Sequence, residues 1–587
     1  MLGPIFNRET LTVPRQSRHY LTRAFYLGAL WVLGLTAWTT LFGWSGPVSQ
    51  GDLAAFGTLL FRLLAYAQLV LVIFFSALLA AGAVAQEKDR RTFVLLLITD
   101  LKHREIVLGK LLGSLLQIIV LLAASVPILS LTLLLGGVAP LQVLQAFLVL
   151  LGSALAAGAL GCVMALWREK TFQTLALTVL GIVLYFLAVE ALGVLSYLDL
   201  LDAQAVQALQ TVLNPFRTLA RVIMPPIEGS IWNSTLAGLA VMLGLTTLLA
   251  GIGIVRLRVW NPRGEPIQKS EEDQAAEEKK ERNIHAAPGK VRPVWANPIL
   301  WREIMTRAYG TRTLVIKLVF LLVALALGYA AIRALPGVER ANRLAPALGI
   351  VPVLVLSLLL VNAQAVTSIT TERDLGALEL LLVTDLTPKE FLFGKLGGIL
   401  YNSKEILLPP LLLLLVYAAM GYCGPEATVY LSVTILTLMA FTIMLGVHVA
   451  LRTVKARQAI VASIGTIFFL TVGTMLCIYL IVIGGKFEYQ WTSFVFFLAI
   501  GIGGMFLVLG GREPSTAISI AAAACPLGMF YGITSVLVGN PRTGQSGDIL
   551  WPFAVVVGAF GFAVAAMLIP QLAEFNPALP HQSAAAE

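Results

Sequence analysis

The chain has 587 residues, of which 58% are hydrophobic and only 12% are charged. Soluble domains carry about 45–50% apolar and about 25% charged residues, so this composition excludes an ordinary soluble protein. A mean hydropathy of +0.86 indicates a helical integral membrane protein instead. The four cysteines are scattered through apolar stretches without a C-x-x-C pair, which excludes a disulfide framework and a cysteine metal cluster.

Apolar stretches long enough to cross a bilayer recur along the chain, since a membrane-spanning helix needs about 20 such residues. Six are expected before a polar stretch, near 22–43, 63–85, 107–136, 142–166, 173–195 and 233–255. Eight are expected after it, near 314–335, 346–370, 394–420, 429–451, 459–484, 490–510, 515–538 and 551–570. This pattern predicts an all-α polytopic membrane protein with a first transmembrane half (1–258), a linker (259–296) and a second transmembrane half (297–587).

Basic residues predict the orientation, because Lys and Arg gather in cytoplasmic loops. The side that carries the N-terminus and the linker holds 32 of the 41 basic residues, whereas the other side holds eight. Both termini are therefore expected in the cytoplasm, and the net charge of +9 reflects topology rather than nucleic-acid binding. The linker is polar without an apolar face, which favours a solvated connector over a regulatory segment.

A block of 24 residues occurs twice at an offset of 285, with 11 of 24 positions identical. Its copies are EKDRRTFVLLLITDLKHREIVLGK at 87–110 and ERDLGALELLLVTDLTPKEFLFGK at 372–395. Because six spans separate the copies, the halves are parallel repeats, which disfavours the inverted repeats of many ion-coupled transporters. The matched polar residues are Glu87/Glu372, Asp89/Asp374, Thr99/Thr384, Asp100/Asp385, Glu105/Glu390 and Lys110/Lys395.

Each block is expected to form a short interfacial helix, a turn and the start of the next span. In the second copy, Leu378 and Leu382 share one helix face while Glu379 lies on another. After the turn, Thr387 is expected at the N-cap and Glu390 at N3 of a capping box. Two copies in matched register favour a docking helix that receives motion from a cytoplasmic partner over a plain charged loop.

The pattern Glu-x-Asp…Leu-Leu-Leu-x-Thr-x-Leu…Glu…Gly-Lys, with six spans per half, resembles the permeases of ABC-2-type transporters. These are membrane subunits of ATP-binding-cassette systems. The resemblance implies that 87–110 and 372–395 are coupling helices for an ATPase subunit. The opening matches PIFNRE and PILWRE are similar to the family's connecting helix, which singles out Arg8, Glu9, Arg302 and Glu303.

The same resemblance implies two ATPase copies on one chain, outward transport and a prokaryotic inner membrane. ATP and Mg²⁺ are then expected on the partner, and no cofactor on this chain. The second half departs from the family pattern by an extra hairpin near 490–538. The alternative is that 515–538 forms a re-entrant pair of half-helices.

Motifs for catalysis are missing from the sequence. None of the four Gly-Lys pairs is followed by Ser or Thr, so the chain has no P-loop for ATP hydrolysis. The five histidines are dispersed, and no catalytic residue or metal site is expected. Two other classes stay open, an ion-coupled secondary carrier and a non-transporting membrane partner of an ATPase. ATP dependence of flux separates these classes from the permease.

Charges inside the spans are candidates for a substrate pathway, because each costs about 2.5–3.5 kcal/mol to insert. Lys404 and Glu405 are expected near mid-bilayer, about 15 Å beyond Lys395 along the helix, with Tyr401 just before them. Glu190 is expected toward the outer end of the fifth span. The alternative to a pathway is that Lys404 pairs with a carboxylate inside the bundle and fixes its packing.

Overall fold

The computed structural model describes most of the chain, and every regular element in the described part is an α-helix. Fourteen helices are long and apolar enough to cross a membrane, at the places where the sequence predicts spans. The chain is therefore a polytopic membrane protein. The described residues are 3–12, 17–43, 46–47, 49–90, 92–168, 170–193, 202–224, 231–261, 294–305, 313–335, 344–374, 376–382, 386–484, 490–510, 515–538 and 549–573.

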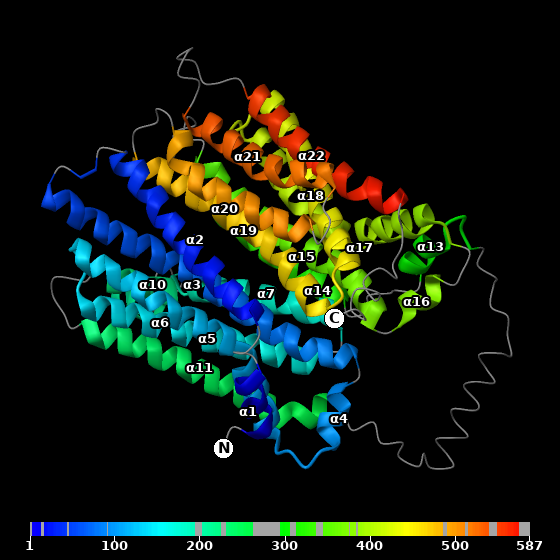
Figure 1. Cartoon of the computed structure of the whole chain (residues 1–587), viewed down its shortest axis with the longest axis horizontal. Helices are drawn as coiled ribbons and strands as arrows, with labels where there is room; N and C mark the ends of the chain where they lie inside the picture. The colour runs from blue at the N-terminus through cyan, green and yellow to red at the C-terminus, as the bar shows by residue number, and fades with distance from the viewer. Residues whose placement is uncertain are drawn as a thin grey trace.

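Each half begins with a short helix and continues with its spans (Figure 1). Helices cross the membrane because hydrocarbon offers no partner for an open backbone amide or carbonyl group. The first half holds α1 (Gly3–Thr12), α2 (Ser17–Phe42), α3 (Gln50–Asp89), α4 (Thr92–Ile98), α5 (His103–Leu135), α6 (Pro140–Trp167), α7 (Thr171–Ala191), α9 (Ala203–Leu213), α10 (Pro215–Ile223) and α11 (Ile231–Trp260). The second half holds α13 (Pro298–Met305), α14 (Thr313–Ala334), α15 (Leu344–Asp374), α16 (Ala377–Leu382), α17 (Pro388–Ala419), α18 (Pro425–Arg452), α19 (Ala456–Gly484), α20 (Gln490–Gly510), α21 (Thr516–Val538) and α22 (Leu550–Ala573).

The short helices α1, α4, α13 and α16 lie at the same end of the bundle, toward the lower right of Figure 1. We call this the basic end, because its loops carry most of the Lys and Arg residues. Of the predicted linker, residues 262–293 lie outside the described part of the chain.

The two halves repeat one packing scheme around their second spans. In the first half α3 packs against α5, α6 and α7, and α6 packs against α11. In the second half α15 packs against α17, α18 and α19, and α18 packs against α22. The short helices follow the same rule, since α1 packs on α5 and α13 packs on α17.

A repeated glycine lets the second and fourth spans approach closely. A Cβ on Gly161 of α6 would overlap the carbonyl oxygen of Ala77 on α3. Gly446 of α18 lies 285 positions later, and a Cβ there would be 2.7 Å from Cβ of Ala365 on α15. Small residues at such crossings allow close van der Waals contact where the hydrophobic effect cannot drive helix association.

The segment at 490–538 differs between the halves. Its two helices α20 and α21 are each continuous, and α21 runs through Pro526 without a break. The structure thus has two membrane-length helices here, and the re-entrant alternative for 515–538 is wrong. In the first half the described residues between α7 and α11 form only the short helices α9 and α10.

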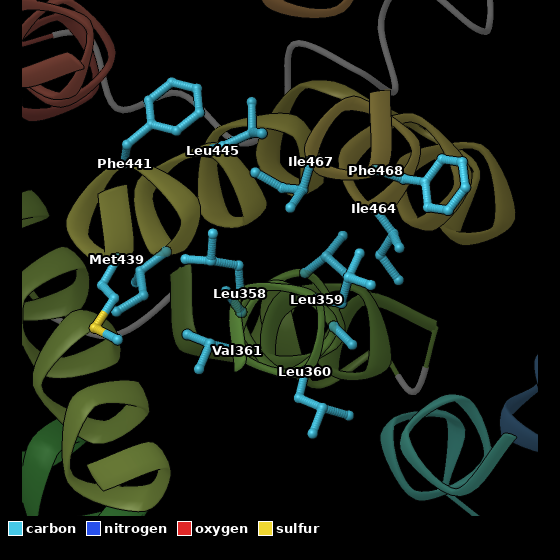
Figure 2. Packing of buried hydrophobic residues seen from close by; sticks show 14 of the residues in the cluster. Leu358, Leu359, Leu360, Val361, Met439, Phe441, Leu445, Ile464, Ile467 and Phe468 are labelled. Atoms are coloured by element: carbon cyan, nitrogen blue, oxygen red, sulfur yellow. The ribbon is translucent and has the colours of Figure 1, made fainter. Parts of the chain in front are cut away.

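The halves meet through their fifth spans. Helix α7 packs against α14 and α15 of the second half, while α19 packs against α2 and α3 of the first. Figure 2 shows part of the shared core, where Leu359 of α15 points toward Ile464 and Phe468 of α19, while Leu360 points away from them. Phe468 also stacks on Phe74 of α3, with ring centroids 4.0 Å apart.

We expect Gly161→Ala to destabilise the fold by about 1–3 kcal/mol, since its methyl group would force α6 away from α3. Gly82→Ala, on the facing helix, is the matched control because a Cβ there has nothing within 4 Å. It should be neutral or stabilising by up to about 1 kcal/mol, given the better helix propensity of Ala. Thermal unfolding of the detergent-purified proteins measures both effects, and equal melting temperatures would contradict the close crossing.

Candidate functional site

The ends of each repeated block are joined by an ion pair. Glu87, at the end of α3, pairs with Lys110 in α5. Glu372, at the end of α15, pairs with Lys395 in α17 at 2.7 Å. Both pairs bridge the second and third spans, which the short helix α4 or α16 connects in sequence. The repeat in sequence is thus also a repeated contact, which fixes the two ends of each block relative to each other.

In the second half this contact extends to α13. The Nζ of Lys395 lies 2.6 Å from Oε1 of Glu303, and both side chains are almost fully buried, at 1% and 2% exposure. Arg302 adds a further ion pair to Glu372. Gly398 permits this approach, because a Cβ there would lie 2.6 Å from Cβ of Glu303. Helix α13 is therefore bound to α15 and α17 through charge.

In the first half, α1 packs on α5 as α13 packs on α17. Arg8 of α1 is exposed. The side chain of Glu9 lies outside the described residues, as do the whole of Thr384 and Asp385. Their predicted roles therefore stay predictions.

A second repeated contact binds the blocks to the fourth spans. Lys88 Nζ donates to the carbonyls of Leu166 at 2.6 Å and Arg168 at 3.0 Å, where α6 ends. Arg373, 285 positions later, donates to carbonyls at the end of α18, including that of Thr453. The last carbonyls of a helix lack partners within it and carry negative partial charge, so a cation stabilises them.

The sequence pattern did not predict this repeated contact, because Lys88 and Arg373 differ in identity. The signal that could have predicted it is a positive charge present in both copies at the offset of 285, between the matched Glu and Asp of each block.

Helix α4 has a buried face and an exposed apolar face. Phe93 and Leu97 are buried in a core cluster with residues of α3, α5, α6 and α11. On the other side Leu95 and Ile98 are each 64% exposed, and Val94 is 36% exposed. We call these three residues the α4 strip. In α16, Leu378 is buried as the sequence predicts, whereas the side chains of Glu379 and Leu382 lie outside the described residues.

The turn after each short helix is closed by a repeated carboxylate. Glu390 accepts a hydrogen bond from the backbone amide of Thr387 at 3.0 Å, and Thr387 Oγ1 accepts one from the amide of Glu390. This confirms the predicted capping box. Glu105 accepts from the amide of Lys102 at 3.0 Å, in the equivalent place. The third spans therefore start at a fixed point in both halves.

Thr99 and Asp100 of the first block lie at the end of α4. Thr99 donates to the Leu96 carbonyl at 2.6 Å and closes α4, and Asp100 is exposed in the turn that follows.

The two matched aspartates have different partners. Thr171 of α7 donates to Asp89. Asp374 instead accepts from Nη2 of Arg90 at 3.1 Å, which joins the second spans of the two halves. The carboxylates of Asp89 and Asp374 are close enough to interact electrostatically. The ends of the two second spans therefore meet at a charged contact at the basic end.

The candidate pathway residues lie in two separate places. Glu190, at the end of α7 away from the basic end, accepts from Arg217 Nε at 3.1 Å and Asn214 Nδ2 at 3.0 Å. It thereby anchors α10 to α7.

The other three pathway residues lie on α17 of the second half. Lys404 is exposed on the outside of the bundle, with its Nζ 4.2 Å from the ring centroid of Tyr401. Glu405 pairs with Lys317 at 2.9 Å, in the second turn of α14. Asn402, three residues before Glu405, donates to the carbonyl of Glu303 at 3.3 Å, so the first turns of α17 run beside α13. The depth of Lys404 and Glu405 in the bilayer stays a prediction.

We expect Lys395→Met to destabilise the protein by about 3–5 kcal/mol, because it removes the nearest cation of the buried Glu303 carboxylate and leaves only Arg302, at 3.4 Å, for two carboxylates. Adding Glu303→Gln should recover a large part of the loss, since the double variant buries no net charge. Thermal unfolding of the single and double variants measures the coupling. Additive effects would contradict a direct interaction between the two side chains.

No protein-family model matches the chain, and a search of curated proteins finds no match to its sequence. Within the described residues no group of three or more His, Cys, Asp or Glu side chains is placed to hold a metal ion. Any assignment of function therefore rests on the repeated block, its ion pairs and the α4 strip.

Proposed function

We propose that this chain is the membrane permease of an ABC-2-type transporter, with both transmembrane halves fused in one polypeptide. A separate ATPase subunit docks at the basic end, on α4 and α16. The observation that carries the proposal is the α4 strip. Two of its residues expose about two-thirds of their apolar side chains at the end of a bundle where charges otherwise predominate. Exposed apolar patches beside polar surroundings are typical of protein-binding sites.

The contacts of the first block would transmit a displacement of α4 to the spans around it. Phe93 and Leu97 bury α4 in a core cluster shared with α3, α5 and α6, while the pair of Glu87 with Lys110 ties α3 to α5. Lys88 adds a link from α3 to the end of α6. A displacement of α4 by a partner would therefore move three spans as one body. The ion pairs of Lys395 would do the same for α13, α15 and α17.

Two ATPase copies are proposed, one on each block, with ATP and Mg²⁺ bound by those subunits. Their closure would rock the halves about the contact between the second spans, where Arg90 meets Asp374. The basic end is proposed to face the cytoplasm of a prokaryotic cell, in its inner membrane, and the direction of transport to be outward.

An ion-coupled carrier is less favoured by the contacts of its candidate carboxylates. Glu405 pairs with Lys317, and Glu190 pairs with Arg217. Each carboxylate already has a cation in the same half, so neither needs an external ion or proton to balance its charge. The non-transporting partner of an ATPase differs from the permease in having no ATP-driven flux.

We expect Leu95→Asp combined with Ile98→Asp to abolish association with the ATPase, because two carboxylates would be buried in an apolar interface. Association is measured by pull-down in mild detergent with mass spectrometry, where the unchanged chain should retain about two P-loop ATPases.

Leu134→Asp is the matched control, since this residue is also exposed but lies at the opposite end of α5. It should retain the partner. Loss of the ATPase from the control, or its retention by the α4 variant, would overturn docking at the α4 strip. A chain that never retains an ATPase would overturn the permease proposal itself.

A further inference from the structure

The duplication creates two seams between the halves, and they are not equivalent. In the α2/α19 seam, α19 packs against α2 and α3. In the α7/α14 seam, α7 packs against α14 and α15. Exchanging the halves would exchange these two seams. The contacts of the two seams can therefore be compared position by position.

The α2/α19 seam is covered by α20 of the extra hairpin, which lies along α2 (Figure 1). Away from the basic end, Thr39 Oγ1 donates to the carbonyl of Ser493 at 3.2 Å. Toward the basic end, Gly504 faces the ring of Phe25. Between these points Leu30 of α2 and Phe494 of α20 are buried in the same core cluster. Helix α20 therefore covers α2 over most of its length.

Residues that only the second half possesses hold α20 in place. Nε2 of His448 lies 3.1 Å from the carbonyl oxygen of Leu509, near the last turn of α20. Arg452 donates to that carbonyl at 3.2 Å and to the carbonyl of Gly510 at 3.1 Å. The first-half counterparts of His448 and Arg452 are Val163 and Trp167. The cover over α2 is thus bound to α18 by contacts that the first half cannot form.

The interior of the α2/α19 seam is also more tightly interlocked. Phe468 of α19 stacks on Phe74 of α3, and its ring centroid lies 5.7 Å from that of Phe75. The counterparts in the α7/α14 seam are Val183, Leu359 and Leu360. Stacked and edge-to-face aromatic pairs add about 0.5–1.5 kcal/mol beyond their buried area. The α7/α14 seam lacks that contribution at these three positions.

The α7/α14 seam has no cover of this kind in the described part of the chain. Helices α9 and α10 follow α7, but they pack on α6 and α11 rather than along α14. The outer face of α14 is left exposed and apolar, with Leu318, Leu322 and Leu325 all more than half exposed. Its inner face packs against α7 and α15, in one apolar cluster that includes Phe172, Leu175, Ile316, Phe320 and Val323.

We infer that the halves separate at the α7/α14 seam while the α2/α19 seam stays closed, and that the opened seam admits a bilayer-dissolved molecule with an apolar chain. The surfaces that would part are apolar, and they open toward hydrocarbon rather than water. A charged solute would find no partner there, whereas an acyl chain replaces one apolar contact by another. The driving force of opening, though not its side, rests on the proposed function.

The test uses the full chain in liposomes that contain a phosphatidylcholine with a diazirine in one acyl chain. After illumination, mass spectrometry locates the lipid adducts by residue. Two matched pairs of buried positions are compared. Ala324 of α14 and Leu30 of α2 are 294 positions apart, the offset between the PIFNRE and PILWRE matches, and both are buried. Leu175 of α7 and Ile460 of α19 are 285 positions apart, the offset of the repeated block, and both are buried. We expect at least tenfold more adducts at Ala324 and Leu175 than at their counterparts. Equal labelling, the reverse order or no adducts at any of the four positions would overturn the inference.

A second measurement uses a disulfide to hold the α2/α19 seam closed. Thr39→Cys with Ser493→Cys, in a variant whose four native cysteines are replaced by alanine, permits a disulfide between α2 and α20. Oxidation should leave lipid labelling of Ala324 unchanged, and a severalfold fall would overturn the inference. Addition of the ATPase with ATP tests the proposed function separately. Labelling that favours the α7/α14 seam but does not change with ATP would contradict the permease proposal. It would still support opening at the α7/α14 seam alone.

Discussion

The structure depends on a constraint set by the bilayer, which supplies no hydrogen-bond partner to polar groups in its hydrocarbon. Backbone amides and carbonyls therefore form their hydrogen bonds within long helices. Most ion pairs and charged hydrogen bonds between helices lie near the helix ends. The carbonyls at the ends of α6 and α18 receive Lys88 and Arg373. Lys395 is buried at the basic end with two carboxylates around it. Because these contacts hold the repeated blocks, the parts that would meet a partner are joined to the spans through charge.

Duplication then explains what the two halves share. The pair of Glu372 with Lys395 repeats that of Glu87 with Lys110, and a glycine at the same offset sets the spacing of the second and fourth spans. Differences concentrate where one half carries residues that the other lacks. His448 and Arg452 bind the extra hairpin. The halves thus keep a common frame and diverge in what is attached to it.

Sequence alone predicted the parts that depend on local pattern. All 14 spans follow from apolar length, and the capping box of Thr387 with Glu390 follows from spacing. Lateral neighbours could not be predicted, because an apolar helix looks much the same on every side. The alignment of α20 with α2 and the pairing of Glu405 with Lys317 therefore appear only in three dimensions. The contact of Asn402 with the carbonyl of Glu303, which places the first turns of α17 beside α13, is likewise a contact between helices that no local pattern predicts.

The two halves share one packing scheme but differ in the extra hairpin and in the residues at their seams. This combination could convert the same displacement at both blocks into a motion on one side of the bundle. Two blocks of the same design would receive the same displacement from two identical partners. Each fifth span then transmits it to a seam, and the two seams resist differently. One holds a stacked aromatic pair and the hairpin anchored by His448, and the other has aliphatic side chains at the positions that correspond to that pair and no such hairpin over α14. The seam with the lower resistance yields first, so the extra hairpin would set the side on which the bundle opens without contacting either block.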